Sequence, residues 1–390
     1  MTTLEDEARR LTEEVTYGHG AVEQVPGIVR RFGARRVLLV CGRRSFESSG
    51  ASRMLPALDE DHDLVRWSDF SPNTDADDLG RGLEILRSHA PDLVLAVGGG
   101  SAMDLAKLLC AFGTLGAGAD LVEAIERGPR IDSRGPALVL VPTTSGSGSE
   151  ATHFAVVYVG QDKHSIAGPG MLPDHVVLDP DLSTSGSPYQ RASSGIDAVC
   201  QAIESLWATG ATDESRDLAR RALSLLLDHI EGFVAEPSVS STEGMCLGSH
   251  LAGRAINISK TTAAHALSYG ITMRHGISHG HAVALTLGLF IEAHADAGPD
   301  SLQPGVDPDG HHHVMQQVLD LLGGTDPAAA RARFTHLLER IGLEPRLTAA
   351  GVTDAAERDA LVAGVNLERL GNNPVQFGQD DLRSLLARAA

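Results

Sequence analysis

The chain of 390 residues has little lysine, few aromatic side chains and no long apolar run. Only three of its 32 basic residues are lysine (Lys107, Lys163 and Lys260), and 51 acidic residues give a formal net charge of -19. Such a charge argues against a surface for nucleic acid or for an anionic membrane. A bilayer span would need a run of about 18 apolar residues, which the sequence lacks. We therefore expect no nucleic-acid partner and no membrane insertion.

Cysteine is also scarce. The four cysteines are scattered without a CxxC spacing, which favours reduced, buried thiols over disulfides or a zinc site: Cys41, Cys110, Cys200 and Cys246. The first residues, MTTLEDEARRLTEE, are acidic and polar, unlike a signal peptide. With 42% hydrophobic and 21% charged residues, the composition is that of an ordinary globular protein. These features predict a cytoplasmic protein.

Two patterns divide the chain. In the first part, short apolar runs alternate with segments of helical period, which predicts a mostly parallel sheet covered on both faces. Strands are expected at 35–42, 92–100, 136–144 and 154–160, with a helix at 75–90. After about residue 186 the apolar segments have helical spacing. We expect an α/β dinucleotide-binding domain at 1–185 and an all-helical domain at 186–390. The segment PGVDPDGHHHV (304–314) is expected to be a solvated loop.

Two polar loops follow expected strands. AVGGGSAMDLAK (96–107) places three glycines before the start of a helix, where backbone N–H groups could bind phosphate. Alone, GGGS is as well explained by a tight turn, and it is neither GxGxxG nor GxxxxGK[ST]. PTTSGSGSEAT (142–152) is a second loop, rich in hydroxyl groups. Because both follow strands of one expected sheet, together they predict a nucleotide-binding crevice.

Histidines gather in a later, mostly apolar window: His265, His275, His279 and His281. The expected helix at 193–207 presents Asp197 and Gln201 on one face. Asp197 could be a cap or part of a buried ion pair, and a lone histidine on an apolar helix is more often a core residue. Two imidazoles with one or two oxygen ligands, however, suit Fe(II) or Zn(II) with an open position for substrate.

These motifs resemble the iron-containing (group III) alcohol dehydrogenase family. GGGSAMDLAK, PTTSGSGSE, GIDAVCQAIE and two histidines 14 residues apart follow the order of the family over residues 17–290. The resemblance implies a dehydroquinate-synthase-like fold, with NAD(P) on the α/β domain and a divalent metal on the helical domain, Fe2+ before Zn2+. In that family the metal lies in the cleft between the domains and polarises the oxygen of an aldehyde or alcohol. A homodimer is also expected.

Residue by residue, the resemblance implies several roles. The pyrophosphate loop matches Gly98, Gly99, Gly100, Ser101 and Asp104. The loop near the ribose and nicotinamide matches Thr143, Thr144 and Ser147. The metal ligands match Asp197, Gln201, His265 and His279, and the catalytic residues are His265, His279 and Tyr269. Most members have histidine where Gln201 stands, and many have another at Tyr269, so metal affinity and proton delivery are expected to differ. His275 is not a ligand position and is expected at the surface.

The residues after the strand at 35–42 bear on the choice of cofactor. NAD-preferring members of the family tend to carry an acid there, which would repel a 2′-phosphate. In this chain Gly42 is followed by Arg43 and Arg44, which could pair with phosphate or could be solvated. NADP is therefore expected to be accepted at least as well as NAD.

Four segments are similar to the phosphonoacetaldehyde reductase branch of the family: ASSGIDAVCQAIESLWA, LAGRAINISKTTAAHALSYGIT, HGHAVALTL and NLERLGNNP. This similarity implies NAD(P)H-dependent reduction of a small anionic aldehyde, phosphonoacetaldehyde, to 2-hydroxyethylphosphonate in phosphonate or phosphinate natural-product synthesis. Sulfoacetaldehyde and uncharged short aldehydes are alternatives within the family. A dehydroquinate-synthase-type lyase and a metal-poor binding protein are alternatives from other classes.

An anionic substrate needs a local cation in so acidic a protein. Lys260 stands in an otherwise uncharged segment, and on a continuous helix it would lie about 7.5 Å before His265 along the axis. A structural alternative pairs Lys260 with a carboxylate, Glu204 or Glu150. The substrate-binding candidates are Lys260, Asn257, Thr261, His281 and His153.

Overall fold

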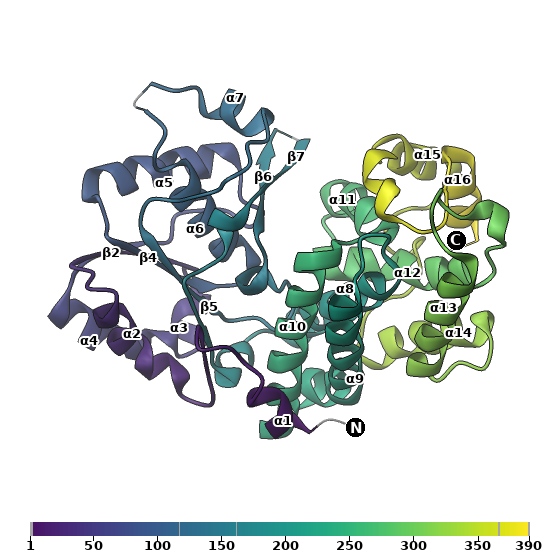
Figure 1. Ribbon diagram of the computed structural model, residues 1–390, viewed down its shortest axis with the longest axis horizontal. Coiled ribbons are helices and arrows are strands. Elements are labelled where there is room, and N and C mark those ends of the chain that lie inside the picture. The colour runs from purple at the N-terminus through teal and green to yellow at the C-terminus, as the bar shows by residue number, and fades with distance from the viewer. Residues whose placement is uncertain (1–2, 117, 161, 366, 389–390) are drawn as a thin grey trace. The chain divides into compact units, whose positions relative to one another are not determined.

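The computed structural model describes residues 3–116, 118–160, 162–365 and 367–388, and the chain divides into two compact units at residues 186 and 187 (Figure 1). Asn366, which opens the segment NLERLGNNP, lies outside the described residues. In the described part of the chain, no helix is both long and apolar enough to cross a membrane.

The N-terminal unit is built on a six-stranded parallel sheet, in the order β1-β8-β5-β4-β2-β3. Its strands are β1 (Val15–Tyr17), β2 (Arg36–Cys41), β3 (Asp63–Trp67), β4 (Leu93–Gly98), β5 (Ala137–Pro142) and β8 (His175–Leu178). The strands expected at 35–42, 92–100 and 136–144 are confirmed as β2, β4 and β5. β1, β3 and β8 were not expected, because they are short or carry charged residues.

Helices cover both faces of this sheet (Figure 1). Successive side chains of a strand point to opposite faces, so Leu38 and Val40 of β2 pack into one core cluster, whereas Val37 and Leu39 pack into the other. The first cluster includes residues of α5 (Ala76–His89) and α6 (Gly100–Phe112); the second includes residues of α2 (Val25–Arg31), α3 (Ser45–Ser48) and α4 (Leu55–Asp61). The helix expected at 75–90 is confirmed as α5. The short helices α1 (Leu4–Ala8) and α7 (Leu121–Glu126) complete the unit.

The strand expected at 154–160 forms, but outside the main sheet. β6 (Phe154–Val159) pairs antiparallel with β7 (Asp162–Ala167) as a separate two-stranded sheet. A backbone turn at Gly160, with φ of 59°, returns the chain directly, and no crossover helix separates this strand from its partner. A parallel pairing would need such a crossover.

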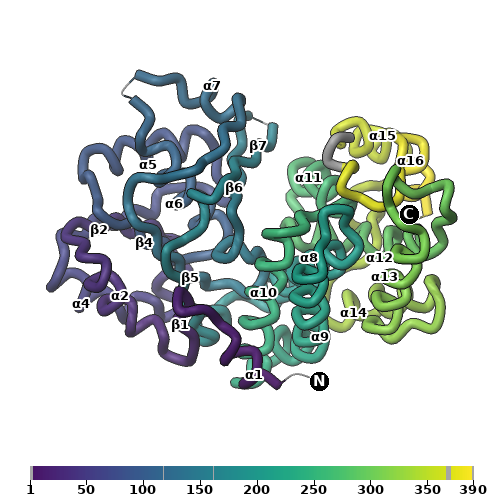
Figure 2. The backbone as a smooth tube through the Cα atoms, in the orientation of Figure 1, coloured from purple at the N-terminus to yellow at the C-terminus, as the bar shows by residue number. Residues whose placement is uncertain are grey.

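The second unit is helical, and among its described residues the only bridge is an isolated one between Leu302 and Val375. Its helices are α8 (Pro188–Trp207), α9 (Asp213–Ala235), α10 (Val239–Ser259), α11 (Ala263–His275), α12 (His279–Ala295), α13 (Pro308–Leu322), α14 (Pro327–Arg340), α15 (Ala355–Ala363) and α16 (Gln379–Ala387). α8 begins with a capping box between Ser187 and Gln190. It packs against α9, α10 and α12 (Figure 2). Three of its polar residues, Asp197, Gln201 and Glu204, are buried. The expected fold class, an α/β unit followed by an all-α unit, is confirmed.

Residues 304–314 were expected to form a loop, but this is wrong for the second half of the segment, which belongs to α13. Asp307 caps the start of α13, where its carboxylate accepts a hydrogen bond from Gly310 N at 2.8 Å, and Pro308 occupies the first turn. These start signals prevail over the Gly- and Asp-rich composition. His311 is consequently buried, and its Nε2 donates to the carbonyl of His294 at 3.0 Å.

Candidate metal and cofactor sites

Three side chains of the helical unit converge on one point. Asp197 projects from α8, His265 from α11, and His279 is the first residue of α12. Nε2 of His265 lies 3.4 Å from Oδ1 of Asp197, and Nε2 of His279 lies 3.9 Å from the same oxygen. One ligand atom from each residue falls within 4.8 Å of the others. The two helices that carry the histidines thus bring both imidazoles to one carboxylate.

Gly280 allows this close approach. A Cβ at Gly280 would stand 2.1 Å from the carbonyl oxygen of Ser193 and 2.6 Å from Cβ of Asp197. Any larger residue would push the start of α12 away from α8. The glycine that follows His279 in the sequence is therefore required for His279 to reach Asp197.

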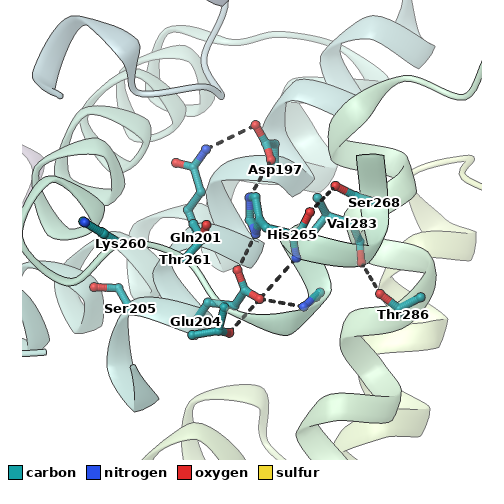
Figure 3. Close-up of polar contacts among 12 residues, drawn as sticks. Asp197, Gln201, Glu204, Ser205, Lys260, Thr261, His265, Ser268, Val283 and Thr286 are labelled. Atoms are coloured by element: carbon teal, nitrogen blue, oxygen red, sulfur yellow. Dashed lines mark hydrogen bonds and ion pairs between the residues drawn. The ribbon is translucent and has the colours of Figure 1, made fainter. Parts of the chain in front are cut away.

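A buried glutamate orients His265. Glu204 is fully buried on α8, two turns after Asp197, and its Oε2 accepts a hydrogen bond from Nδ1 of His265 (Figure 3). Its Oε1 accepts from Thr262 Oγ1 at 2.8 Å and from Ala264 N at 3.0 Å. Because Nδ1 is held by Glu204, Nε2 of His265 points toward Asp197 and is the nitrogen that can offer a lone pair to a metal. Sequence reasoning considered Glu204 only as a partner for Lys260; its spacing of seven residues from Asp197 on one helix face was the available signal.

Burial and charge act in opposite directions on His265. Burial by itself lowers the pKa of the imidazole, but the negative charge of Glu204 and the close contacts with the carboxylates of Asp197 and Glu204 outweigh it and raise the pKa to about 9. The surroundings of His265 are thus arranged for a positive charge, whether a proton or a metal ion.

His279 is held in a similar way. Ser268 Oγ donates to the carbonyl oxygen of His265 at 2.7 Å, so its oxygen can accept from Nδ1 of His279 at 3.3 Å. That arrangement leaves Nε2 of His279 for a ligand. The ring of Tyr269 stacks on the ring of His279, with centroids 5.6 Å apart and planes 4° from parallel.

Gln201 lies one turn after Asp197 and is buried. Its Nε2 donates to Oδ2 of Asp197 at 3.2 Å (Figure 3). The amide therefore helps to orient Asp197, in addition to any oxygen that it offers to a metal.

The residues present fit a divalent metal. Nε2 of His265 is buried and has no hydrogen bond to any described residue, although it lies beside a carboxylate oxygen. Two imidazoles and a carboxylate form a donor set that Fe(II) and Zn(II) accept. A buried nitrogen without a hydrogen bond is otherwise unfavourable.

The remaining two histidines, His281 and His275, have partners within the helical unit. His281 donates from Nε2 to the carbonyl of Glu344 at 2.8 Å, and its Nδ1 lies 3.2 Å from the hydroxyl of Tyr189. Both ring nitrogens are thus engaged within the unit, and a contact of His281 with substrate stays a prediction. His275 was expected at the surface, but its side chain is only 13% exposed and its Nε2 lies 3.4 Å from Glu357.

Lys260 does not lie on a continuous helix. α10 ends at Ser259 and α11 begins at Ala263, so Lys260 belongs to the short link between them. Its side chain is exposed, and among the described residues no carboxylate forms an ion pair with it. Glu204, the alternative partner, is engaged with His265 and Thr262.

The other three substrate candidates are half-buried. Asn257, in the last turn of α10, and Thr261 are half-buried. His153 is half-buried in the N-terminal unit, where its ring meets that of Phe154 edge-on at 5.7 Å.

The two polar loops of the N-terminal unit lie against each other. β4 ends at Gly98, α6 starts at Gly100, and Thr143 N donates to the carbonyl of Gly98 at 2.9 Å. A Cβ at Gly100 would stand 3.0 Å from Oγ of Ser147, a contact so tight that Ser147 would have to shift. Backbone N–H groups at the start of α6 and the exposed Thr144 therefore meet at the carboxyl end of parallel strands, where nucleotides bind in such sheets. Ser101 Oγ accepts from Asn73 N at 3.2 Å.

Asp104 is engaged within the N-terminal unit. Its Oδ1 accepts from Ser149 Oγ at 2.5 Å and its Oδ2 accepts from Val156 N at 3.0 Å. One turn later, the fully buried Lys107 donates to the carbonyl oxygens of Thr152 at 2.8 Å and Phe154 at 3.0 Å. Both side chains fasten α6 to the second polar loop. Both carboxylate oxygens of Asp104 thus accept hydrogen bonds that hold the second polar loop and β6 to α6, and its role toward the cofactor stays a prediction.

Arg43 is exposed and forms an ion pair with Asp69, in which Nη2 lies 2.5 Å from Oδ1. Asp69 follows β3, the neighbour of β2, so the arginine and the acid share the carboxyl edge of the sheet. Sequence reasoning missed Asp69, because the polar strand before it was not expected.

Comparison with known proteins identifies relatives of both units. Residues 12–180 match the family model described as iron-containing alcohol dehydrogenase, and residues 191–390 match that of the C-terminal part of the Fe-containing alcohol dehydrogenase family. The chain is 34% identical over 313 residues to a phosphonoacetaldehyde reductase of Streptomyces viridochromogenes, covering 77% of each chain. It is 28% identical over 385 residues to long-chain-alcohol dehydrogenase 1 of Geobacillus thermodenitrificans, covering 95% and 94%. A crystal structure of sulfoacetaldehyde reductase from Bifidobacterium kashiwanohense in complex with NAD+ superposes with a TM-score of 0.84 at 29% identity over 96% of each chain.

Proposed function

Since the chain belongs to the iron-containing alcohol dehydrogenase family, we propose that it reduces a small anionic aldehyde, phosphonoacetaldehyde first among them, to the corresponding alcohol. As a member of the family, the protein is a nicotinamide-dependent alcohol dehydrogenase or aldehyde reductase. The observation that carries the proposal is the cluster of Asp197, His265 and His279. The link that contains Lys260 immediately precedes α11, the helix that carries His265. The product would be 2-hydroxyethylphosphonate, as in phosphonate or phosphinate natural-product synthesis.

In this proposal Asp197, His265 and His279 hold Fe2+, and Gln201 is the weakest of the ligands because a neutral amide oxygen contributes little charge stabilisation. When bound, the metal supplies a Lewis acid for the carbonyl oxygen and the nicotinamide supplies the hydride. Glu204 and Ser268 keep the two imidazoles oriented. Tyr269, stacked on His279, takes the place of a histidine found in many members and is the candidate to deliver the proton that completes the alcohol.

The proposed substrate class rests on Lys260. An aldehyde with a phosphonate group must find a cation in a protein of formal charge -19. Lys260 is exposed, lies five residues before His265, and pairs with no described carboxylate. Asn257 and Thr261 stand beside it and could donate further hydrogen bonds. The 34% identity to a phosphonoacetaldehyde reductase points to the same class.

A substrate panel tests the proposal. Iron-loaded protein with NADH or NADPH should show a higher kcat/KM for phosphonoacetaldehyde than for sulfoacetaldehyde, and a much higher one than for propanal. Lys260→Ala should lower kcat/KM for phosphonoacetaldehyde by about tens to hundreds of fold, the range for one charge-assisted contact. Propanal reduction should change little. Equal activity of the wild type on propanal and phosphonoacetaldehyde would contradict the proposal.

Sulfoacetaldehyde is the second candidate substrate. The structural similarity to a sulfoacetaldehyde reductase favours it, and its sulfonate also places an anion two carbons from the aldehyde. A phosphonate carries more negative charge near neutral pH than a sulfonate, so the two substrates should respond differently to Lys260→Ala. The kcat/KM ratio for the two aldehydes decides between them.

A further inference from the structure

Lys260 has a backbone conformation that is almost confined to glycine. Its φ is 60° and its ψ is -179°. Asn73 and Ala90 are the other non-glycine residues with positive φ in the described ranges. Ala90, with φ of 48° and ψ of 61°, lies in the ordinary left-handed region, whereas Lys260 lies outside it. A side chain at such a position is unfavourable, and it persists only where surrounding contacts enforce it.

Contacts on both sides of Lys260 enforce this conformation. Ser259 Oγ donates to Ser205 Oγ at 2.7 Å, which fixes the end of α10 against α8. On the other side, Thr262 Oγ1 donates to Glu204 Oε1 at 2.8 Å and accepts from Trp207 Nε1 at 2.9 Å. The chain therefore has to pass from Ser259 to Thr262 between two anchored points.

A distant amide closes the turn. Nδ2 of Asn372 donates to the carbonyl oxygens of Ser259 at 2.8 Å and Thr261 at 2.9 Å, one residue to each side of Lys260. Its Oδ1 accepts from Gly210 N at 3.0 Å and from Thr209 Oγ1 at 3.2 Å. Because both ends of the amide are used, Asn372 holds the link rigidly to the segment that follows α8.

The same turn is tied to the metal ligands. Glu204 accepts hydrogen bonds from Thr262 and from the imidazole of His265 (Figure 3). One buried carboxylate thus fixes both the end of the strained link and the orientation of a metal ligand. The Cα of Lys260 consequently keeps a set distance from the cluster.

No hydrogen bond or ion pair of the Lys260 side chain with a described residue explains its strained backbone. The side chain of Lys260 is exposed, and among the described residues it has no ion-pair partner, so glycine would fill the turn with less strain. Strain of this kind clusters at functional sites. We propose that residues 259–262 form a strained recognition turn that fixes the ammonium of Lys260 for the anionic end of the substrate, with Asn372 as its positioning residue. This inference rests on the proposed anionic substrate.

Glycine and alanine variants test the strain itself. At an ordinary position glycine is less stable than alanine, because it has more conformational freedom to lose. At this position the order should invert, with Lys260→Gly melting about 2–4 °C above Lys260→Ala. Both variants should lose about tens to hundreds of fold in kcat/KM for phosphonoacetaldehyde and stay within about twofold of wild type on propanal. Ala90→Gly is the matched control, since it relieves a positive φ elsewhere and should leave selectivity unchanged.

Asn372→Ala tests the positioning role. It retains the ammonium but releases the turn, so KM for phosphonoacetaldehyde should rise about tenfold while kcat, metal content and propanal reduction stay close to wild type. Equal losses on both aldehydes would assign Asn372 to general stability and overturn its positioning role.

A Lys260→Gly variant that melts no higher than Lys260→Ala would overturn the strained turn. A stabilised Lys260→Gly variant with unchanged selectivity would overturn anion recognition by Lys260 while the proposed substrate survives. Absence of any preference for anionic aldehydes in the wild type would instead overturn the proposed function.

Discussion

Glu204 and His265 form a buried pair in which the carboxylate accepts the Nδ1 proton of the imidazole. The pair directs Nε2 of His265 to the side where Asp197 and His279 lie. A carboxylate behind a ligating histidine fixes the tautomer and makes the imidazole a stronger ligand. Glu204 is thus part of the candidate metal centre although it provides no ligand atom.

We expect Glu204→Gln to weaken Fe2+ or Zn2+ binding about 10- to 100-fold, the usual effect of losing such a partner. Competition with a chelator at fixed pH measures the dissociation constant, and circular dichroism checks that the helices persist. Glu231→Gln is the control, because Glu231 pairs on the surface of the same unit with Arg340 at 2.8 Å. An unchanged metal affinity in Glu204→Gln would remove this role from Glu204.

The second prediction concerns the two histidines of the candidate metal site. His265→Ala and His279→Ala should abolish metal content and turnover, because each removes an imidazole from a site with a single carboxylate. Gln201→His should keep or tighten metal binding, since imidazole is the better ligand. Elemental analysis of protein purified without oxygen measures the content. Full metal content in His279→Ala would show the assignment to be wrong.

We expect cofactor preference to depend on the pair of Arg43 and Asp69. We expect NADPH to be used at least as well as NADH, because Arg43 and Arg44 can meet a 2′-phosphate. Arg43→Ala should lower kcat/KM for NADPH about tenfold more than for NADH, whereas Asp69→Asn, which removes a nearby negative charge, should shift the ratio the other way. A strong preference for NADH that persists unchanged in an Arg43→Ala/Arg44→Ala double variant would contradict this.

We predict that the buried imidazole of His294 makes the folded protein less stable in acid. The imidazole is fully buried on α12, 4.4 Å from the ring of Trp207 between centroids, and burial lowers its pKa to about 3, with His311 adding to the effect. Between pH 6.5 and 3 the unfolded chain binds a proton that the folded protein does not. The free energy of unfolding should therefore be unaffected by His294 above pH 6.5 and fall below it, by up to about 1.4 kcal/mol per pH unit.

Urea unfolding between pH 7.5 and 4.5 measures this effect. His294→Leu should have a shallower loss of stability with falling pH than the wild type. His336→Leu is the control, because His336 is exposed on α14 with 63% of its side chain accessible and should leave the slope unchanged. Parallel slopes for the wild type and His294→Leu would contradict the prediction.

Local patterns in the sequence were sufficient for three strands of the main sheet, for the helical nature of the second unit and for the choice of Asp197 and the histidines as candidates. The apolar runs that became β2, β4 and β5 alternate between two cores, and the spacing of Asp197 and Gln201 places both on one helix face. The glycine-rich loops at strand ends can likewise be recognised from a short stretch of sequence. Such features depend on neighbouring residues, whose hydrophobic period and backbone preferences can be recognised without tertiary contacts.

The direction and partner of each polar side chain were decided only by tertiary packing. Glu204 meets His265 because α8 packs beside the start of α11, and Asp104 is engaged because the loop after β5 folds back onto α6. The helix expected through Lys260 is broken by anchors at Ser205, Glu204 and Asn372, the last of them more than a hundred residues away. Hydrogen bonds between residues so distant in sequence leave no periodic signal, because a buried polar group takes whichever partner the packing brings within about 3 Å.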